Sequence, residues 1–144
     1  MDSLKDYWND KGRLFCELND SPNKNFANNA KRKIIGEVCS SLPKNNSKEL
    51  EWFAKALEDE SLKWFAVEVF KKKKALPKKL FLSFVKAAIY EEDISLNRNF
   101  ISPCVKTFGA AEVSKCLNFY IENGESLEKK GAIELKYWVD KLSL

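Results

Sequence analysis

The most concentrated charge in the sequence is a lysine run near the middle of the chain. It comprises Lys71, Lys72, Lys73, Lys74, Lys78 and Lys79. Ammonium groups at this density can bind the phosphates of a nucleic acid or of an anionic membrane. Lysines also complement the negative end of a helix dipole and keep a helix terminus solvated. Because a charge run is more often a solvated helix end, the second interpretation is favoured. The six lysines are kept as candidate binding residues.

Tryptophans are the second group of candidate binding residues, because they are typical interface anchors. Trp52 and Trp64 each precede a phenylalanine, and Trp138 follows a tyrosine. Neighbouring residues on a helix point about 100° apart, so the two rings of a pair cannot face the same way. One ring of each pair is therefore expected in the core. The other packs against a neighbouring element or lies at a binding surface.

Catalytic and metal-binding chemistry is restricted by the absence of histidine. Catalytic triads of the Ser-His-Asp kind and imidazole zinc ligands are excluded. The cysteines are Cys16, Cys39, Cys104 and Cys116, and no two have Cys-x-x-Cys spacing. They are interpreted as small buried hydrophobes. No phosphate-binding loop or nucleophile motif is present. The sequence therefore predicts a protein that is not an enzyme and that has no metal or cofactor.

These side chains must be positioned by helices. Apolar residues recur at i, i+3, i+4 and i+7 in every long segment, and no segment has strand periodicity. Leu62, Phe65, Ala66, Val69 and Phe70 form one such face in the segment that ends in the lysine run. About eight helices are predicted: 3–18, 25–41, one capped by Ser47, one capped by Ser61, one starting near Pro77, 96–108, one ending at Asn123-Gly124, and one capped by Ser126. Pro103 should kink the sixth helix or begin a new one.

Three of the predicted helices begin alike. Ser-Leu occurs at Ser61-Leu62, Ser95-Leu96 and Ser126-Leu127, so the leucines are 34 and 31 residues apart. Helix pairs with a period in the thirties are typical of α-solenoids. Small residues, such as Gly131-Ala132, allow a neighbouring helix to approach closely. On these Ser-Leu starts, the Pro77 helix start and the small residues, the chain from about 47 to 142 resembles the HEAT/armadillo class of helical repeats.

The predicted fold is a single all-α domain over residues 1–144. Its antiparallel helix pairs stack as a short right-handed α-solenoid, and a compact orthogonal helix bundle is the alternative. The pairs are a divergent one at 1–43 and repeat-like ones at 47–75, 77–108 and 110–142. With 25 basic and 21 acidic residues, the net charge of +4 is mild for a dedicated nucleic-acid binder.

Three functional hypotheses follow. The leading one is a non-catalytic protein–protein interaction module, acting as an adaptor or as a cytoplasmic inhibitor of the immunity type, which binds a protein partner through a solenoid face. The alternative is a HEAT-like protein that binds nucleic acid through the lysines. The third is an enzyme or ligand carrier with a deep polar cavity. A cytoplasmic location is expected, since the sequence shows neither a secretory signal nor an apolar run of transmembrane length.

Overall fold

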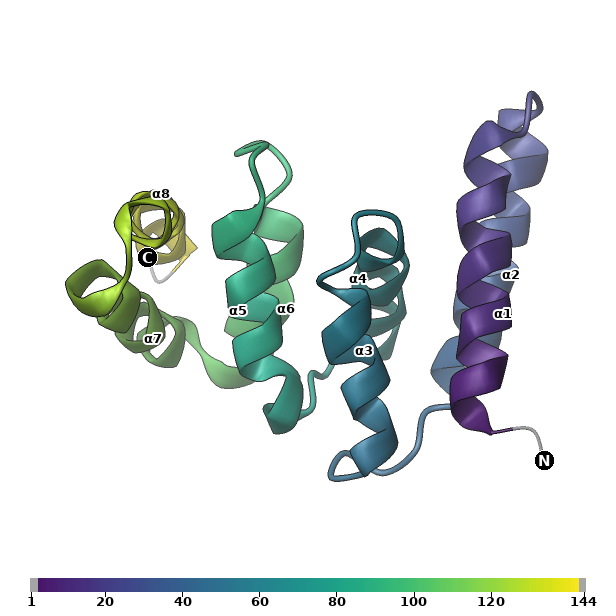
Figure 1. The fold of residues 1–144 in the computed structure, drawn as a ribbon, viewed down its shortest axis with the longest axis horizontal. Helices are drawn as coiled ribbons and strands as arrows, with labels where there is room; N and C mark the ends of the chain where they lie inside the picture. The colour runs from purple at the N-terminus through teal and green to yellow at the C-terminus, as the bar shows by residue number, and fades with distance from the viewer. Residues whose placement is uncertain (1–2, 143–144) are drawn as a thin grey trace. The chain divides into compact units, whose positions relative to one another are not determined.

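The computed structural model describes residues 3–142, and every regular element in this range is helical. The all-α prediction is therefore confirmed. The α-helices are α1 (Leu4–Glu17), α2 (Lys24–Ser40), α3 (Glu51–Ala56), α4 (Leu62–Lys73), α5 (Phe81–Tyr90), α6 (Arg98–Phe108), α7 (Ala110–Asn123) and α8 (Ser126–Leu142) (Figure 1). Short 3₁₀ helices occupy Leu18–Asp20, Lys48–Leu50 and Lys78–Leu80. Within residues 3–142, no helix combines the length and the apolar character needed to cross a membrane.

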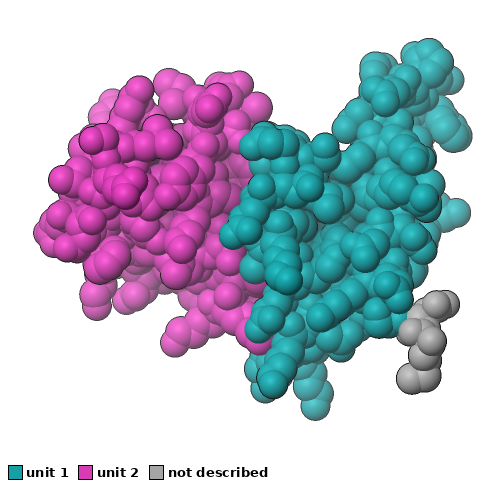
Figure 2. All heavy atoms as spheres, viewed as in Figure 1, with its two compact units in different colours: residues 1–73 teal, residues 74–144 magenta. Residues whose placement is uncertain are grey.

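The chain divides into two compact units, residues 1–73 and residues 74–144 (Figure 2). Unit 1 contains α1 to α4, and unit 2 contains α5 to α8. The boundary falls near the end of the helix pair predicted at 47–75. The single domain over 1–144 stays a prediction, and residues 1, 2, 143 and 144 lie outside the described residues.

The core of unit 1 is built from aromatic rings. Trp8 on α1 is fully buried, and the centroid of its ring lies 4.7 Å from that of Phe53. Its indole N–H donates to the Ser41 hydroxyl at 3.0 Å. Helices α1 and α2 both pack against α4. At Gly12 the side chains of α4 come close to α1, since a Cβ there would lie 2.8 Å from Leu62 Cδ2, the end of a side chain that can shift.

The repeated Ser-Leu motif owes part of its structure to the aspartate two residues before the serine. Asp59 accepts the N–H groups of Ser61 and Leu62 at 2.8 and 2.9 Å, as an N-cap carboxylate does. Asp93 accepts the N–H of Ser95 at 2.9 Å in the same way. Ser61 was predicted as the first cap, whereas the geometry assigns this cap to Asp59. In the third copy Gly124 replaces the aspartate.

Helix α6 starts later than predicted and continues past Pro103 as one helix to the predicted end at Phe108. A turn occupies residues 94–97, so the helix begins at Arg98 rather than at Leu96. Pro103 is buried within α6, and the helix continues to Phe108. It ends at Gly109, whose φ of 91° is a conformation that glycine adopts at little cost.

Unit 2 is organised around α8, which contacts α5, α6 and α7. The closest approach is at Gly131, where a Cβ would lie 2.4 Å from the carbonyl oxygen of Ile89 on α5. This confirms that the small residues at 131–132 admit a neighbouring helix. Next to this contact, Tyr90 donates its hydroxyl to Glu128 at 2.5 Å. The hydrogen bond raises the pKa of Tyr90 to about 12 and lowers the pKa of Glu128.

Candidate functional site

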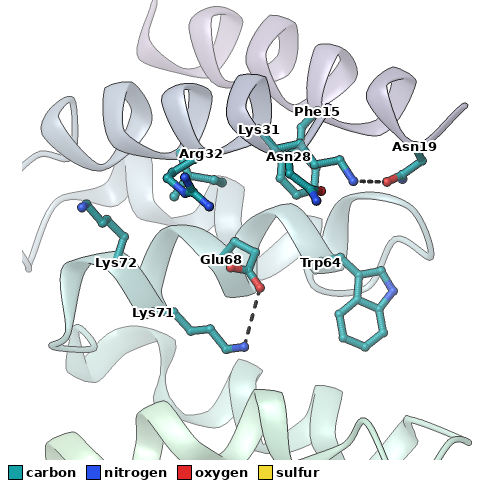
Figure 3. A pocket seen from close by; sticks show the side chains of 10 residues that line it. Phe15, Asn19, Asn28, Lys31, Arg32, Trp64, Glu68, Lys71 and Lys72 are labelled. Atoms are coloured by element: carbon teal, nitrogen blue, oxygen red, sulfur yellow. Dashed lines mark hydrogen bonds and ion pairs between the residues drawn. The ribbon is translucent and has the colours of Figure 1, made fainter. Parts of the chain in front are cut away.

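A groove of about 620 Å³ lies on unit 1, mainly between α2 and α4. Four of its lining residues are cationic, one is a carboxylate, and the others are aromatic, aliphatic or amide side chains. They are Phe15, Asn19, Asn28, Lys31, Arg32, Ile35, Trp64, Glu68, Lys71 and Lys72 (Figure 3). The groove therefore carries an excess of three positive charges. We refer to these ten residues as the basic groove.

Helical spacing explains how these residues come to one surface. On α4, Trp64 and Glu68 are four residues apart, and Lys71 and Lys72 follow three and four residues later, so all lie on one face. On α2 the groove residues are at i, i+3, i+4 and i+7, which also places them on one face; they are Asn28, Lys31, Arg32 and Ile35. Figure 3 shows Arg32 near Lys72 at one end of the groove and Asn28 toward Trp64 at the other. The two helices therefore run in the same direction and align their polar faces.

The four cations of the basic groove differ in the interactions that their side chains make within the chain. Lys71 lies 3.6 Å from Glu68, while Lys31 donates to the amide oxygen of Asn19 and lies 5.1 Å from the ring of Phe15. Arg32 and Lys72 are exposed, and neither has a carboxylate within ion-pair distance among the described residues. These two side chains have charge that is available to a ligand.

Only part of the lysine run faces the basic groove. Lys71 and Lys72 line it together with Trp64, whereas Lys73 and Lys74 are not among the lining residues. Lys74 directly follows α4 and has a φ of 68°. Lys78 and Lys79 are exposed in the 3₁₀ helix of unit 2.

The other two candidate tryptophans lie elsewhere. Trp52 belongs to the aromatic cluster of unit 1, where its ring lies 5.8 Å from that of Trp8. Its indole N–H donates to Asn9 Oδ1 at 2.8 Å. Trp138 lines a separate pocket in unit 2, beneath the guanidinium of Arg98 at 5.6 Å.

Several groove residues were not selected as candidates from the sequence. Lys31 and Arg32 were visible as a basic segment, but their partner helix was unknown. Glu68 and Asn28 gave no signal beyond their place in the helical spacing. A search for polar residues at matching positions of α2 and α4 would have found them, provided that the two helices were known to be neighbours.

The chemistry available in the basic groove is binding by charge, by hydrogen bonds and by contact with an indole ring. Within residues 3–142, no three cysteine or acidic side chains converge in a way that could hold a metal ion. Burial raises the pKa of Cys16, Cys104 and Cys116, which makes these three thiols poor nucleophiles.

Comparison with known protein families, with curated proteins and with solved structures finds no match to this chain. The resemblance to HEAT/armadillo repeats therefore rests on the helix pattern alone. The function is therefore inferred from the geometry of the site.

Proposed function

We propose that this chain is a non-catalytic interaction module whose basic groove binds an acidic segment of a protein partner. The helix pairs in this proposal stack as a short right-handed α-solenoid, with a compact orthogonal bundle as the alternative. Support comes from unit 1, where α2 and α4, the second helices of the first two predicted pairs, lie side by side and run in the same direction. Stacked repeats place equivalent helices in this way.

The observation that carries the proposal is the convergence of cations from two helices on one groove. Charges at a surface attract a complementary ligand more strongly as the contact excludes water. The groove follows α4 from Trp64 to Lys72, which is eight steps along the helix, or about 12 Å at a rise of 1.5 Å per residue. An extended segment of about four residues covers this length. Phe15, Ile35 and Trp64 supply apolar surface for one of its side chains.

A nucleic acid is the second candidate, and Trp64 is the observation that favours it. An indole next to cations can stack on a base while the cations bind phosphates. Glu68 lies among the cations and repels any anion placed next to it. A nucleic acid carries a phosphate at every nucleotide, whereas a peptide segment can place an uncharged residue beside Glu68 and its carboxylates beside the cations. The acidic peptide segment is therefore the better fit. A cytoplasmic adaptor or an immunity-type inhibitor would use such a groove to recognise its partner.

The test is a charge reversal in the groove with a matched control. Arg32→Glu combined with Lys72→Glu changes two exposed cations that have no carboxylate partner among residues 3–142. Lys5→Glu combined with Lys55→Glu makes the same change in net charge at exposed positions of unit 1 outside the groove. The probes are a fluorescein-labelled Glu-Glu-Leu-Glu-Glu peptide and a labelled single-stranded oligothymidylate, measured by fluorescence anisotropy at several salt concentrations.

We expect the peptide to bind the wild-type chain and the groove variant to bind it at least about tenfold more weakly, a change of about 1.4 kcal/mol. The control should stay within about twofold of the wild type. Binding of the oligonucleotide but not of the peptide, with a steep loss of affinity as salt rises, would favour the nucleic-acid function instead. If neither probe binds, or if both variants lose affinity equally, the groove is not the site.

A further inference from the structure

A second pocket, of about 510 Å³, lies within unit 2 between α8 and the segment that leads into α6. Its walls are largely apolar and are formed by Ile94, Ile133, Tyr137 and Trp138. Three of these side chains are more than half exposed: Ile94 at 63%, Ile133 at 55% and Tyr137 at 67%. The polar lining residues are Asn97, Arg98 and Glu134. We refer to this site as the unit 2 pocket.

Asn97 is the unusual residue of the unit 2 pocket. It is 5% exposed, and among the described residues it is the one buried side chain that is polar or charged. It occupies the N-cap position of α6, where an asparagine usually accepts a main-chain N–H with its side chain. Here its backbone is helical, with φ −63° and ψ −23°, and the side chain makes no capping hydrogen bond.

The turn before α6 explains why Asn97 is not needed as a cap. Main-chain hydrogen bonds join the N–H of Asn97 to Asp93 O at 3.1 Å and the N–H of Phe100 to Asn97 O at 3.1 Å. The N–H of Asn99 donates to Leu96 O at 3.1 Å. The turn thus satisfies these main-chain groups by itself. The Asn97 carboxamide has no hydrogen-bond partner within residues 3–142.

A buried amide without a partner costs free energy, unless water or a ligand reaches it. The structure contains no side-chain polar atom that is both sealed from solvent and unpaired among its described residues. The Asn97 amide is therefore in contact with solvent, and Asn97 is one of the residues that line the unit 2 pocket. A carboxamide offers a donor and an acceptor side by side. This is the pattern that pairs with the N–H and C=O of a peptide main chain.

We propose that the unit 2 pocket binds an extended peptide segment of a protein partner. The Asn97 carboxamide pairs with the main chain of the segment, and one aliphatic or aromatic side chain of the segment packs against Ile94, Ile133 and Trp138. Charge favours this occupant over a polyanion, because one cation and one anion, Arg98 and Glu134, line the pocket. The segment differs from the acidic ligand of the basic groove, so this proposal stands independently of that function.

The test begins with selection of random heptapeptides displayed on phage against the whole chain. Enriched peptides are synthesised and titrated into ¹⁵N-labelled protein, and the side-chain NH₂ resonances of Asn97 are followed by NMR. We expect peptides with one large apolar residue to shift these resonances. N-methylation of the main chain next to that residue should weaken binding at least about tenfold, since it removes a donor.

Two variants separate binding from folding. Asn97→Leu keeps a similar volume and removes the carboxamide, so we expect at least a tenfold loss of peptide affinity without loss of thermal stability. Ile133→Gln alters the exposed wall and should weaken the same peptides. Asn118→Leu, at an exposed site on α7, is the matched control and should bind them as the wild type does.

Three results would overturn the proposal. One is a selection that yields no peptide able to shift the Asn97 resonances. Another is equal affinity of the selected peptides for the wild type and for Asn97→Leu. The third is marked destabilisation by Asn97→Leu, which would show that the carboxamide has a structural partner. None of these outcomes bears on the basic groove, which is tested by its own charge-reversal variant.

Discussion

Gly131 and Gly36 are both helical glycines, yet their surroundings differ. A Cβ at Gly131 would lie 2.4 Å from a main-chain oxygen, whereas a Cβ at Gly36 would meet nothing within 4 Å. Main-chain atoms cannot move aside as the end of a flexible side chain can. Gly131 is therefore required by packing, and Gly36 is not.

We expect Gly131→Ala to destabilise the protein by about 1–3 kcal/mol, because α5 and α8 must separate or shift. The matched Gly36→Ala should stabilise it by about 0.5–1 kcal/mol through helix propensity. Denaturant unfolding followed by circular dichroism measures both changes. Stabilisation by Gly131→Ala would show that α5 and α8 are not as close as the structure has them.

At the level of elements, the end of α4 separates the lysines of the run. Lys71 and Lys72 lie on the groove face of the helix, and the run continues beyond the helix end. Lys73 is the last residue of α4, and Lys74 adopts a left-handed conformation with φ 68°. This conformation is costly for any residue with a side chain. Lys74 therefore has a strained backbone conformation at the end of α4, and a glycine at this position would relieve the strain.

We expect Lys74→Gly to raise the free energy of unfolding by about 1 kcal/mol, because glycine adopts positive φ freely. Lys73→Gly removes the same charge but lies within the helix, so it should lower stability by about 0.5–1 kcal/mol. Both values come from chemical denaturation under identical buffer conditions. If the two substitutions have the same sign and size, the effect comes from charge rather than from backbone conformation.

At the scale of the whole molecule, the question is whether units 1 and 2 unfold together. The sequence predicts a single domain, whereas the structure has two compact units. Val38 in unit 1 and Val139 in unit 2 are both fully buried and both helical, so they form a matched pair of probes. Their truncation perturbs one unit at a time.

We expect Val38→Ala and Val139→Ala each to cost about 2 kcal/mol. In a single cooperative domain, both substitutions shift the same calorimetric transition by a similar amount. Two transitions, each moved by only one of the substitutions, would contradict the single-domain prediction. Differential scanning calorimetry distinguishes the two cases.

Helix positions were well predicted because they depend on local periodicity. The segment from Leu62 to Lys73 shows apolar residues at helical spacing and is α4 in the structure. The helix predicted at 96–108 ends at Phe108, and Gly109 directly after it has a positive φ of 91°. The starts and caps of the helices were predicted less accurately. The Ser-Leu motif marked the starts of α4 and α8, but α6 begins at Arg98, two residues after its Ser-Leu pair. At α4 the capping carboxylate is that of Asp59, two residues before the serine.

The sequence by itself determined that the protein is helical, where most helices begin and end, and which residues carry concentrated charge. These properties arise from interactions between residues a few positions apart. The tertiary structure decided which charges share a surface. Lys31 and Arg32 join Lys71 and Lys72 because α2 packs beside α4. It also decided that Asn97 is buried and that its carboxamide has no hydrogen-bond partner in the described part of the chain. Both facts depend on contacts between distant segments, and local spacing contains no information about them.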